Sequence, residues 1–133
     1  MGVIVDASFI FPLLVKEDNS DAVNSAFAQL DEITYLDFIL IEVSNALTSS
    51  VRRKRISVQF AAEAQLQLQA MVQNTIPTQQ FLQAAFELAL KINHPVYDCL
   101  YAIAAKENNA TLVTCDGKFS QKLDPQIFKT III

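Results

Sequence analysis

Short apolar runs alternate with longer amphipathic stretches along the chain. The first run, Gly2-Val-Ile-Val, is β-branched and ends in Asp6, a pattern typical of a buried parallel strand that turns straight into a helix. Similar runs predict further short strands at residues 33–36, 74–76, 111–115 and 128–133. The chain therefore begins as a strand–helix unit and continues as an alternation of strands and helices.

Helices are predicted over most of the stretches between these strands. Their expected bounds are 20–30, 38–55, 57–71, 78–92 and 96–108, with Ser20, Ser57 and Pro95 at three of the N-termini. One apolar stripe at helical spacing marks the face of the second helix that we expect to be buried. Its members are Leu40, Val43, Leu47 and Val51. The last helix is apolar nearly all round, which predicts a central position in the fold.

This order of elements predicts an α/β fold with a mostly parallel central sheet. A chain of 133 residues with two Gly and four Pro suits one domain over 1–133, with no linker. Ligands of such folds bind beyond the carboxyl ends of the strands. Asp6 and Asp116 each follow an apolar strand directly, so we expect both at the same edge of the sheet.

Two further acidic residues belong to the candidate site. Asp98 falls in the first turn of the apolar helix, and Glu42 lies near the start of its own helix. Each acid alone is readily explained as a helix cap. All four as caps are less expected, because carboxylates in apolar stretches are costly to bury unless they are paired or bound to a metal. Four converging carboxylates need a cation, and oxygen ligands favour Mg²⁺ or Mn²⁺ over Zn²⁺.

Composition restricts the remaining possibilities. A net charge of −4 and a pI near 4.8 argue against a general nucleic-acid binder, although a local basic patch is compatible with them. No apolar run approaches the roughly 18 residues that cross a bilayer, and the N-terminal run lacks the basic start of a signal peptide. Cys99 and Cys115 are interpreted as buried free thiols of a reducing compartment, so we expect a cytoplasmic protein.

The single histidine, His94, offers neither a metal cluster nor a catalytic triad on sequence grounds, because no second His and no nucleophile motif accompany it. It is predicted to lie in the turn before Pro95.

Four strings of the sequence resemble the four motif blocks of the PIN-domain ribonucleases. They are Val5-Asp6-Ala7-Ser8, Glu42-Val43-Ser44-Asn45-Ala46-Leu47, Tyr97-Asp98-Cys99-Leu100-Tyr101-Ala102-Ile103-Ala104 and Leu112-Val113-Thr114-Cys115-Asp116-Gly117-Lys118-Phe119. Any one block is weakly specific, whereas the four in this order extend over nearly the entire chain. Within that family the blocks are most similar to the VapC-type toxins of toxin–antitoxin pairs.

The resemblance implies a three-layer α/β/α sandwich, a homodimer, a protein antitoxin as partner, and RNA cleavage that depends on Mg²⁺ or Mn²⁺. It assigns a catalytic role to all four acids. Asp6 and Asp98 are the principal metal ligands in this interpretation, and Asp116 and Glu42 bind metal directly or through water. Ser8 and Asn45 support the site by hydrogen bonds. A metal-bound water also removes the need for a histidine base.

The dense basic run Arg52-Arg53-Lys54-Arg55 has two interpretations. Its cations stabilise the C-terminus of the preceding helix, or they contact an RNA backbone or an antitoxin. Lys118, two residues after Asp116, is a further candidate for holding a phosphate.

Two alternatives remain open at this point. An aspartyl-phosphate phosphatase also places an Asp after its first strand, but the haloacid-dehalogenase type needs Asp-x-Asp, and Ser8 stands where the second Asp belongs. A catalytically silent interaction module with the same fold is the other. The sequence identifies neither the RNA nor the antitoxin.

Overall fold

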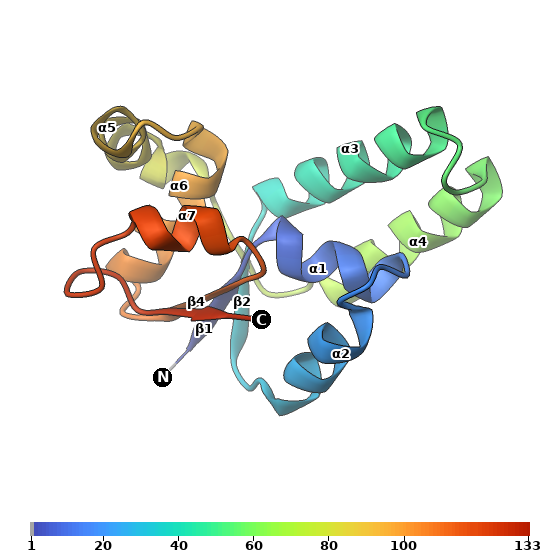
Figure 1. Cartoon of the computed structure of the whole chain (residues 1–133), viewed down its shortest axis with the longest axis horizontal. Helices are drawn as coiled ribbons and strands as arrows, with labels where there is room; N and C mark the ends of the chain where they lie inside the picture. Colours follow the sequence, from blue (N-terminus) through green and yellow to red (C-terminus); the bar gives the residue numbers. More distant parts are fainter. Residues whose placement is uncertain (1) are drawn as a thin grey trace.

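The computed structural model describes residues 2–133, and within them five parallel strands form one sheet in the order β3-β2-β1-β4-β5 (Figure 1). The strands are β1 (Val3–Val5), β2 (Ile33–Leu36), β3 (Thr75–Ile76), β4 (Thr111–Thr114) and β5 (Thr130–Ile132). The central strand, β1, pairs Val3 with Ile33 of β2 on one side and Val5 with Val113 of β4 on the other. The prediction of a parallel sheet is confirmed.

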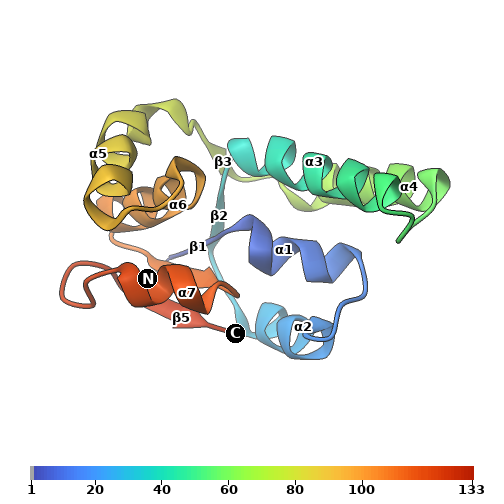
Figure 2. The same cartoon turned by 45° about the horizontal axis from the view of Figure 1, so that its top comes forward.

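The helices cover both faces of this sheet. They are α1 (Ala7–Leu14), α2 (Ser20–Gln29), α3 (Phe38–Arg52), α4 (Val58–Met71), the 3₁₀ turn η1 (Gln79–Phe81), α5 (Leu82–Ile92), α6 (Val96–Glu107) and α7 (Gly117–Lys122). The chain runs outward from β1 to β3 and then crosses back to β4 and β5. Right-handed crossovers place α1–α4 on one face and α5–α7 on the other, as Figure 2 shows. The three-layer sandwich is therefore confirmed.

The reversal of chain direction between β1 and β4 creates a topological switch point. The helix after β1 and the helix after β4 pass to opposite faces of the sheet, so the carboxyl ends of these two neighbouring strands are left uncovered between them. Asp6 directly follows β1, and β4 is separated from Asp116 by one residue. The topology alone therefore brings these two acids to one place.

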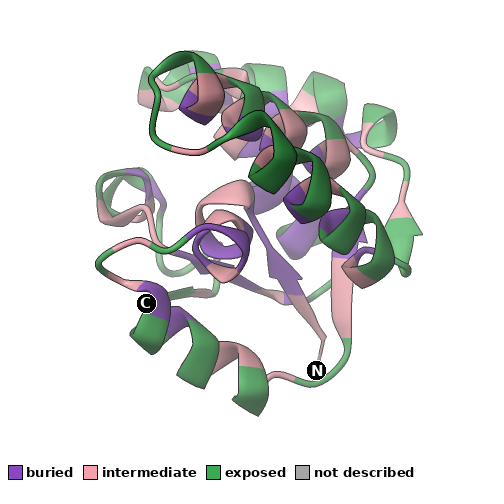
Figure 3. Ribbon diagram, turned by 90° about the vertical axis from the view of Figure 1, so that its right-hand side faces the viewer, coloured by how far each residue is buried: buried purple, intermediate pink, exposed green. Residues whose placement is uncertain are grey.

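The core is centred on β1, β4 and α6 (Figure 3). Every residue of α6 from Cys99 to Ala105 is buried, as expected from its apolar circumference. For α3 the predicted face was wrong in part. Val43 and Leu47 are buried, but they share the face with Ile39 and Ser50. Leu40 instead lines an open groove beside α5, and Val51 is only half-buried, because a helix packed against both α1 and α4 turns a different side inward.

Several element ends differ from prediction for local reasons. The predicted helix 38–55 ends at Arg52, because Lys54 adopts a left-handed conformation with φ 59° and the Arg55 amide turns back to the Ser50 carbonyl. The predicted helix 78–92 begins as η1 before α5. A short helix that was not predicted, α7, follows Asp116, whose carboxylate accepts the Phe119 amide and caps it.

Within residues 2–133, no helix is long and apolar enough to cross a membrane. Both cysteines are free thiols, with Cys99 buried and Cys115 partly buried.

The contribution of the Ser57 N-cap to the stability of α4 can be tested by mutation. Ser57 Oγ accepts the Phe60 amide at 3.0 Å, as predicted from the sequence. We expect Ser57→Ala to lower the free energy of unfolding by about 1 kcal/mol, measured by urea denaturation, because one amide of the first turn loses its acceptor. Ser57→Asp restores an acceptor and should remain close to wild type. Equal losses in both variants would show that the cap contributes little.

Candidate active site

The carboxylate of Asp6 is buried at the carboxyl end of the central strand, with 3% of the residue exposed. It is the N-cap of α1: Oδ1 accepts the Phe9 amide at 3.2 Å and the Ser8 hydroxyl at 2.6 Å. Oδ2 accepts the Thr114 hydroxyl at 2.5 Å. A strand that ends in Asp and enters a helix at once gives this geometry, because the cap fixes the side chain against the first helical turn.

Two hydroxyl groups join the ends of β1 and β4. Ser8 Oγ accepts the Cys115 amide at 2.9 Å, and Thr114 Oγ1 accepts the Asp116 amide at 3.0 Å. The two hydroxyl oxygens lie 3.2 Å apart. Ser8 therefore contacts both Asp6 and the residue after β4, and its supporting role in the site stays a prediction. Thr114 was not among the predicted residues. Its signal in the sequence is a hydroxyl at the end of an apolar strand, directly before the Cys-Asp pair.

Asp98 lies in the first turn of α6, where it meets His94. Its Oδ2 is 2.6 Å from Nε2 of His94. The histidine does lie between α5 and α6 before Pro95, as expected. No expectation from the sequence placed it among the acids, whereas the structure brings it beside Asp98 and Asp116. Positions 94 and 98 are four residues apart across the start of α6, and this spacing was the signal available in the sequence.

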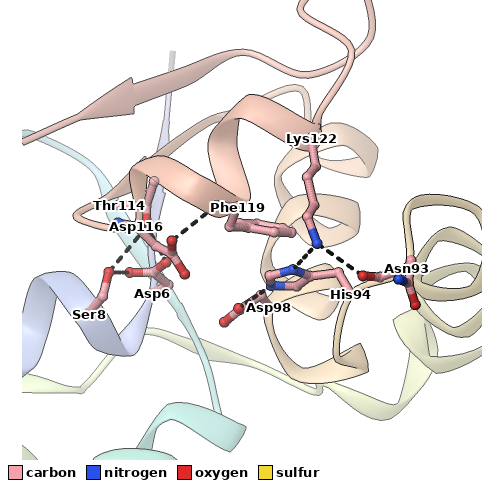
Figure 4. A network of polar contacts seen from close by, with 9 residues as sticks. All are labelled: Asp6, Ser8, Asn93, His94, Asp98, Thr114, Asp116, Phe119 and Lys122. Atoms are coloured by element: carbon pink, nitrogen blue, oxygen red, sulfur yellow. Dashed lines mark hydrogen bonds and ion pairs between the residues drawn. The ribbon is translucent and has the colours of Figure 1, made fainter.

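Asp116 completes a compact group with these two residues (Figure 4). Ligand atoms of His94, Asp98 and Asp116 all lie within 4.8 Å of one another. One oxygen of Asp116, Oδ1, accepts the Phe119 amide at 3.0 Å, which leaves Oδ2 available to a ligand. The predicted metal set was Asp6, Asp98 and Asp116. The structure places two of these in the compact group together with His94, and joins Asp6 to the group through Thr114 and the Asp116 amide.

Glu42 reaches the site from α3, on the opposite face of the sheet from α6. Its Oε1 accepts the hydroxyl of Tyr101 at 2.7 Å. Tyr101 is fully buried, and it lies one turn after Asp98 on the same helix. Burial, followed by the neighbouring Glu42 charge, raises the pKa of Tyr101, so it acts as a permanent donor. Sequence reasoning missed this tyrosine because its partner is distant in the chain.

The electrostatics of the site favour a cation. Burial raises the pKa of Asp6 from 3.8 to about 6, against the lowering effect of its hydrogen bonds, and the Asp98 charge adds to the rise. Burial also raises the pKa of Glu42, and the charges of Asp98 and Asp6 contribute. Ionised carboxylates so close together are stabilised by a positive ion among them. The set is dominated by oxygen donors, which fits Mg²⁺ or Mn²⁺.

Of the remaining predicted residues, Asn45, Arg52 and Arg53 lie away from this centre, and Lys118 lies beside it. Asn45 is exposed, and within residues 2–133 its side chain makes no hydrogen bond to the acids. Arg52 donates to Thr48 on its own helix, and Arg53 caps that helix at the end of the α3–α4 hairpin. Lys118 is exposed at the start of α7, next to the site.

Comparison with known proteins agrees with this arrangement. A family model described as the PIN domain matches residues 3–123. Ribonuclease VapC3 of Pyrobaculum aerophilum is 32% identical over 124 residues, which cover 92% of this chain and 95% of that protein.

Two solved structures share the fold. One is VapC20 of Mycobacterium tuberculosis, described as a toxin that cleaves the sarcin-ricin loop, with a TM-score of 0.73 and 15% identity over 90% of this chain and 94% of that one. The other is VapBC2 of Rickettsia felis, bound to a DNA fragment from its promoter, with a TM-score of 0.68 and 16% identity over 99% and 98% of the two chains. Because the family model spans most of the sequence and Ribonuclease VapC3 is aligned along nearly all of it, this chain belongs to the PIN domain family and is a relative of the VapC ribonucleases.

Proposed function

We propose that this chain is an endoribonuclease that depends on Mg²⁺ or Mn²⁺ and serves in the cytoplasm as the toxin of a toxin–antitoxin pair. Asp6, Asp98 and Asp116 bind the cation in this proposal, and Glu42 is the fourth catalytic acid. The observation that carries the proposal is the buried Asp6 carboxylate at the switch point, beside the compact group of Asp98, Asp116 and His94. Membership of the PIN domain family supports it further.

The cation, when bound, supplies charge neutralisation at the phosphoryl oxygens and lowers the pKa of water. The chain's own residues prepare that chemistry. Ser8 and Thr114 orient Asp6, so that its carboxylate keeps one geometry, and Oδ2 retains one lone pair for the cation. Tyr101 holds Oε1 of Glu42 and leaves Oε2 free. Because burial raises the pKa of Glu42, this oxygen is suited to accept a proton from the attacking water.

Two features support RNA cleavage over the alternatives, an aspartyl-phosphate phosphatase and a catalytically silent interaction module. A phosphatase that forms an aspartyl phosphate needs one exposed nucleophilic carboxylate, whereas both oxygens of Asp6 are engaged in hydrogen bonds and the residue is almost fully buried. A silent interaction module has no need to bury a carboxylate of raised pKa beside two others. The relative named as a ribonuclease supports RNA as the substrate.

Lys118 and the basic run at residues 52–55 are suited to different parts of the RNA. Lys118 stands at the edge of the site and is suited to the phosphate next to the cleaved bond. Arg52 lies about 15 Å along α3 from Glu42, at 1.5 Å per residue. Arg52 and Arg53 therefore suit an RNA segment that flanks the cleaved phosphate. Arg55 is held by Glu17 at 3.3 Å, so it is less available.

The protein partner in this proposal is an antitoxin with an amphipathic helix. A groove between α3 and α4 has an apolar lining, which includes Leu47, Ala61 and Leu66. Leu66 is 65% exposed, and Val58, which lines an adjoining hollow with Ala61, extends the apolar surface on α4. Grooves of this kind receive the apolar face of a helix.

A second apolar surface supports a homodimer. Leu82, Phe86 and Leu90 follow one face of α5 at four-residue spacing, with 48%, 50% and 69% of each residue exposed. Ile41 and Tyr97 add to this surface from α3 and α6. Burying these side chains against a second copy removes them from water, which is the main favourable contribution to such interfaces.

The metal site gives the most direct test. We expect Asp6→Asn and Asp98→Asn to reduce Mn²⁺-dependent RNA cleavage by orders of magnitude, because each change removes a ligand charge. Chelator should abolish wild-type cleavage. The measurement is turnover of a labelled RNA with excess Mn²⁺. Full activity in chelator, or in either variant, would contradict the proposal.

Thermal unfolding in chelator controls for misfolding. Because the pKa of Asp6 is raised when folded, its ionisation destabilises the metal-free protein as pH rises from 3.8 through about 6. Asp6→Asn removes this effect, so its stability relative to wild type should increase over that range. A variant that is inactive only because it unfolds would fail this control.

The basic residues are tested by the salt dependence of RNA binding. Replacing Arg52 and Arg53 with Gln should flatten the plot of log affinity against log salt by about 0.7 for each lost phosphate contact. Lys118→Gln should do the same and also slow cleavage, since it lies at the site. Lys91→Gln on α5 is the control for Lys118→Gln, and Lys91→Gln combined with Lys129→Gln is the control for the double variant, each with an equal charge change at exposed lysines. An unchanged slope for the double variant would leave these arginines as helix-capping residues only.

The homodimer is tested by light scattering at micromolar protein concentration. Wild type should have the mass of two chains, and Phe86→Glu should have the mass of one, because it places a charge within the proposed interface. Leu66→Glu, on the α3–α4 groove, should remain dimeric. A monomeric wild type would argue against the assembly.

A further inference from the structure

A row of three side chains runs from the surface into the acid cluster (Figure 4). Lys122 Nζ, at the C-terminal end of α7, lies 3.3 Å from Nδ1 of His94. Nε2 of the same ring lies 2.6 Å from Oδ2 of Asp98. The two ring nitrogens thus have partners of opposite character, an ammonium group on one side and a carboxylate on the other.

The ammonium group determines which nitrogen carries the proton. Lysine offers donors and no acceptor, so Nδ1 must accept from it. The ring proton then resides on Nε2, where it is donated to Asp98 Oδ2. In this tautomer both hydrogen bonds are satisfied together. The opposite tautomer would set two donors against each other at Nδ1 and leave Nε2 without a proton for the carboxylate.

The ring and the ammonium group are both fixed from other directions. The His94 side chain is 12% exposed and packs on Phe119, with ring centroids 4.7 Å apart. Lys122 also donates to the Asn93 carbonyl at 3.0 Å. Asn93 adopts a left-handed conformation with φ 54°, which ends α5 and turns the chain toward Pro95. His94 is therefore held between α5, α6 and α7.

We propose that Lys122 and His94 are positioning residues, which occupy Oδ2 of Asp98 and so leave Oδ1 available to a cation held with Asp116. This inference rests on the proposed function, in which Asp98 is a metal ligand. His94 acts through Asp98 and is not a ligand itself. A cation at Nε2 would displace the bond to Asp98, and a cation at Nδ1 would stand against the Lys122 ammonium. Hydrogen-bond partners of ligating carboxylates fix their orientation and strengthen metal binding.

The tautomer can be observed directly, because the chain contains one histidine. Long-range ¹H–¹⁵N NMR of the imidazole at mildly alkaline pH should show the proton on Nε2 in wild type. Lys122→Met keeps the length of the side chain and removes the donor, so the signal should shift toward a mixture of tautomers. Lys129→Met, an exposed lysine elsewhere, should leave the spectrum unchanged. A proton on Nδ1 in the wild-type protein would overturn the proposal.

Metal affinity separates the hydrogen bonds from the packing of the ring. His94→Phe keeps an aromatic ring against Phe119 and removes both nitrogens, so the affinity for Mn²⁺, measured by EPR of the free ion, should fall about 10- to 100-fold. His94→Gln keeps one donor and one acceptor and should regain most of the affinity. Thermal unfolding in chelator establishes that each variant is folded. If His94→Phe does not fold, the comparison of Lys122→Met with Lys129→Met, in which only the first should weaken Mn²⁺ binding, gives the same test.

Two results would overturn this inference without touching the proposed function. One is wild-type Mn²⁺ affinity in folded His94→Phe. The other is nitrogen coupling to bound Mn²⁺ in electron spin-echo spectra of the wild type, which would make His94 a ligand. Asp98→Asn distinguishes a failure of the positioning role from a failure of the proposed metal site. It should weaken Mn²⁺ binding at least as much as His94→Phe, and unaltered binding in Asp98→Asn would refute the metal site itself.

Discussion

The buried carboxylate of Asp6 is the constraint on which the rest of the site depends. Removing an ionised carboxylate from water is costly, and here hydrogen bonds from Ser8, Thr114 and the Phe9 amide offset only part of that cost, since the pKa remains raised to about 6. The same hydroxyls also accept backbone amides that follow β4. The same two hydroxyl groups therefore stabilise the Asp6 carboxylate and connect the ends of the two central strands. A mutation that removes either hydroxyl affects both functions.

Helix α6 gives the cluster its rigidity. Its middle is buried on all sides, so its position cannot adjust without disturbing the core. The side chains of Asp98 and Tyr101 extend from α6 one turn apart. Tyr101 determines the orientation of Glu42 on α3. One helix therefore orients two acids, the first directly and the second through a phenol. Asp98 and Tyr101 both belong to its N-terminal half, whereas its other charged residues, Lys106 and Glu107, lie at its exposed C-terminal end.

The sequence was sufficient for the fold class and for most of the elements, because these depend on local patterns. Strand 33–36 was predicted with its observed ends, and the apolar circumference of α6 predicted its central place. The errors arose where tertiary contacts decide. The buried side of α3 depends on packing against two helices, and α7 is too short for periodicity to reveal. Asp6 and Asp116 were predictable from strand ends, whereas the partners Thr114, Tyr101 and His94 required the three-dimensional arrangement. The assigned role of Asn45 gained no support from its exposed position.

The order of the site residues along the chain has a consequence for synthesis on the ribosome. Asp6 emerges from the ribosome 108 residues before Thr114. Thr114 ends β4, the strand that pairs with β1 on its other side and leads to Asp116. A nascent chain that has released only α1–α4 has one central strand edge unpaired and a carboxylate without its second hydroxyl. The acid cluster is therefore assembled only after β4 and Asp116 have been released, and a product truncated before β4 lacks the means to form it.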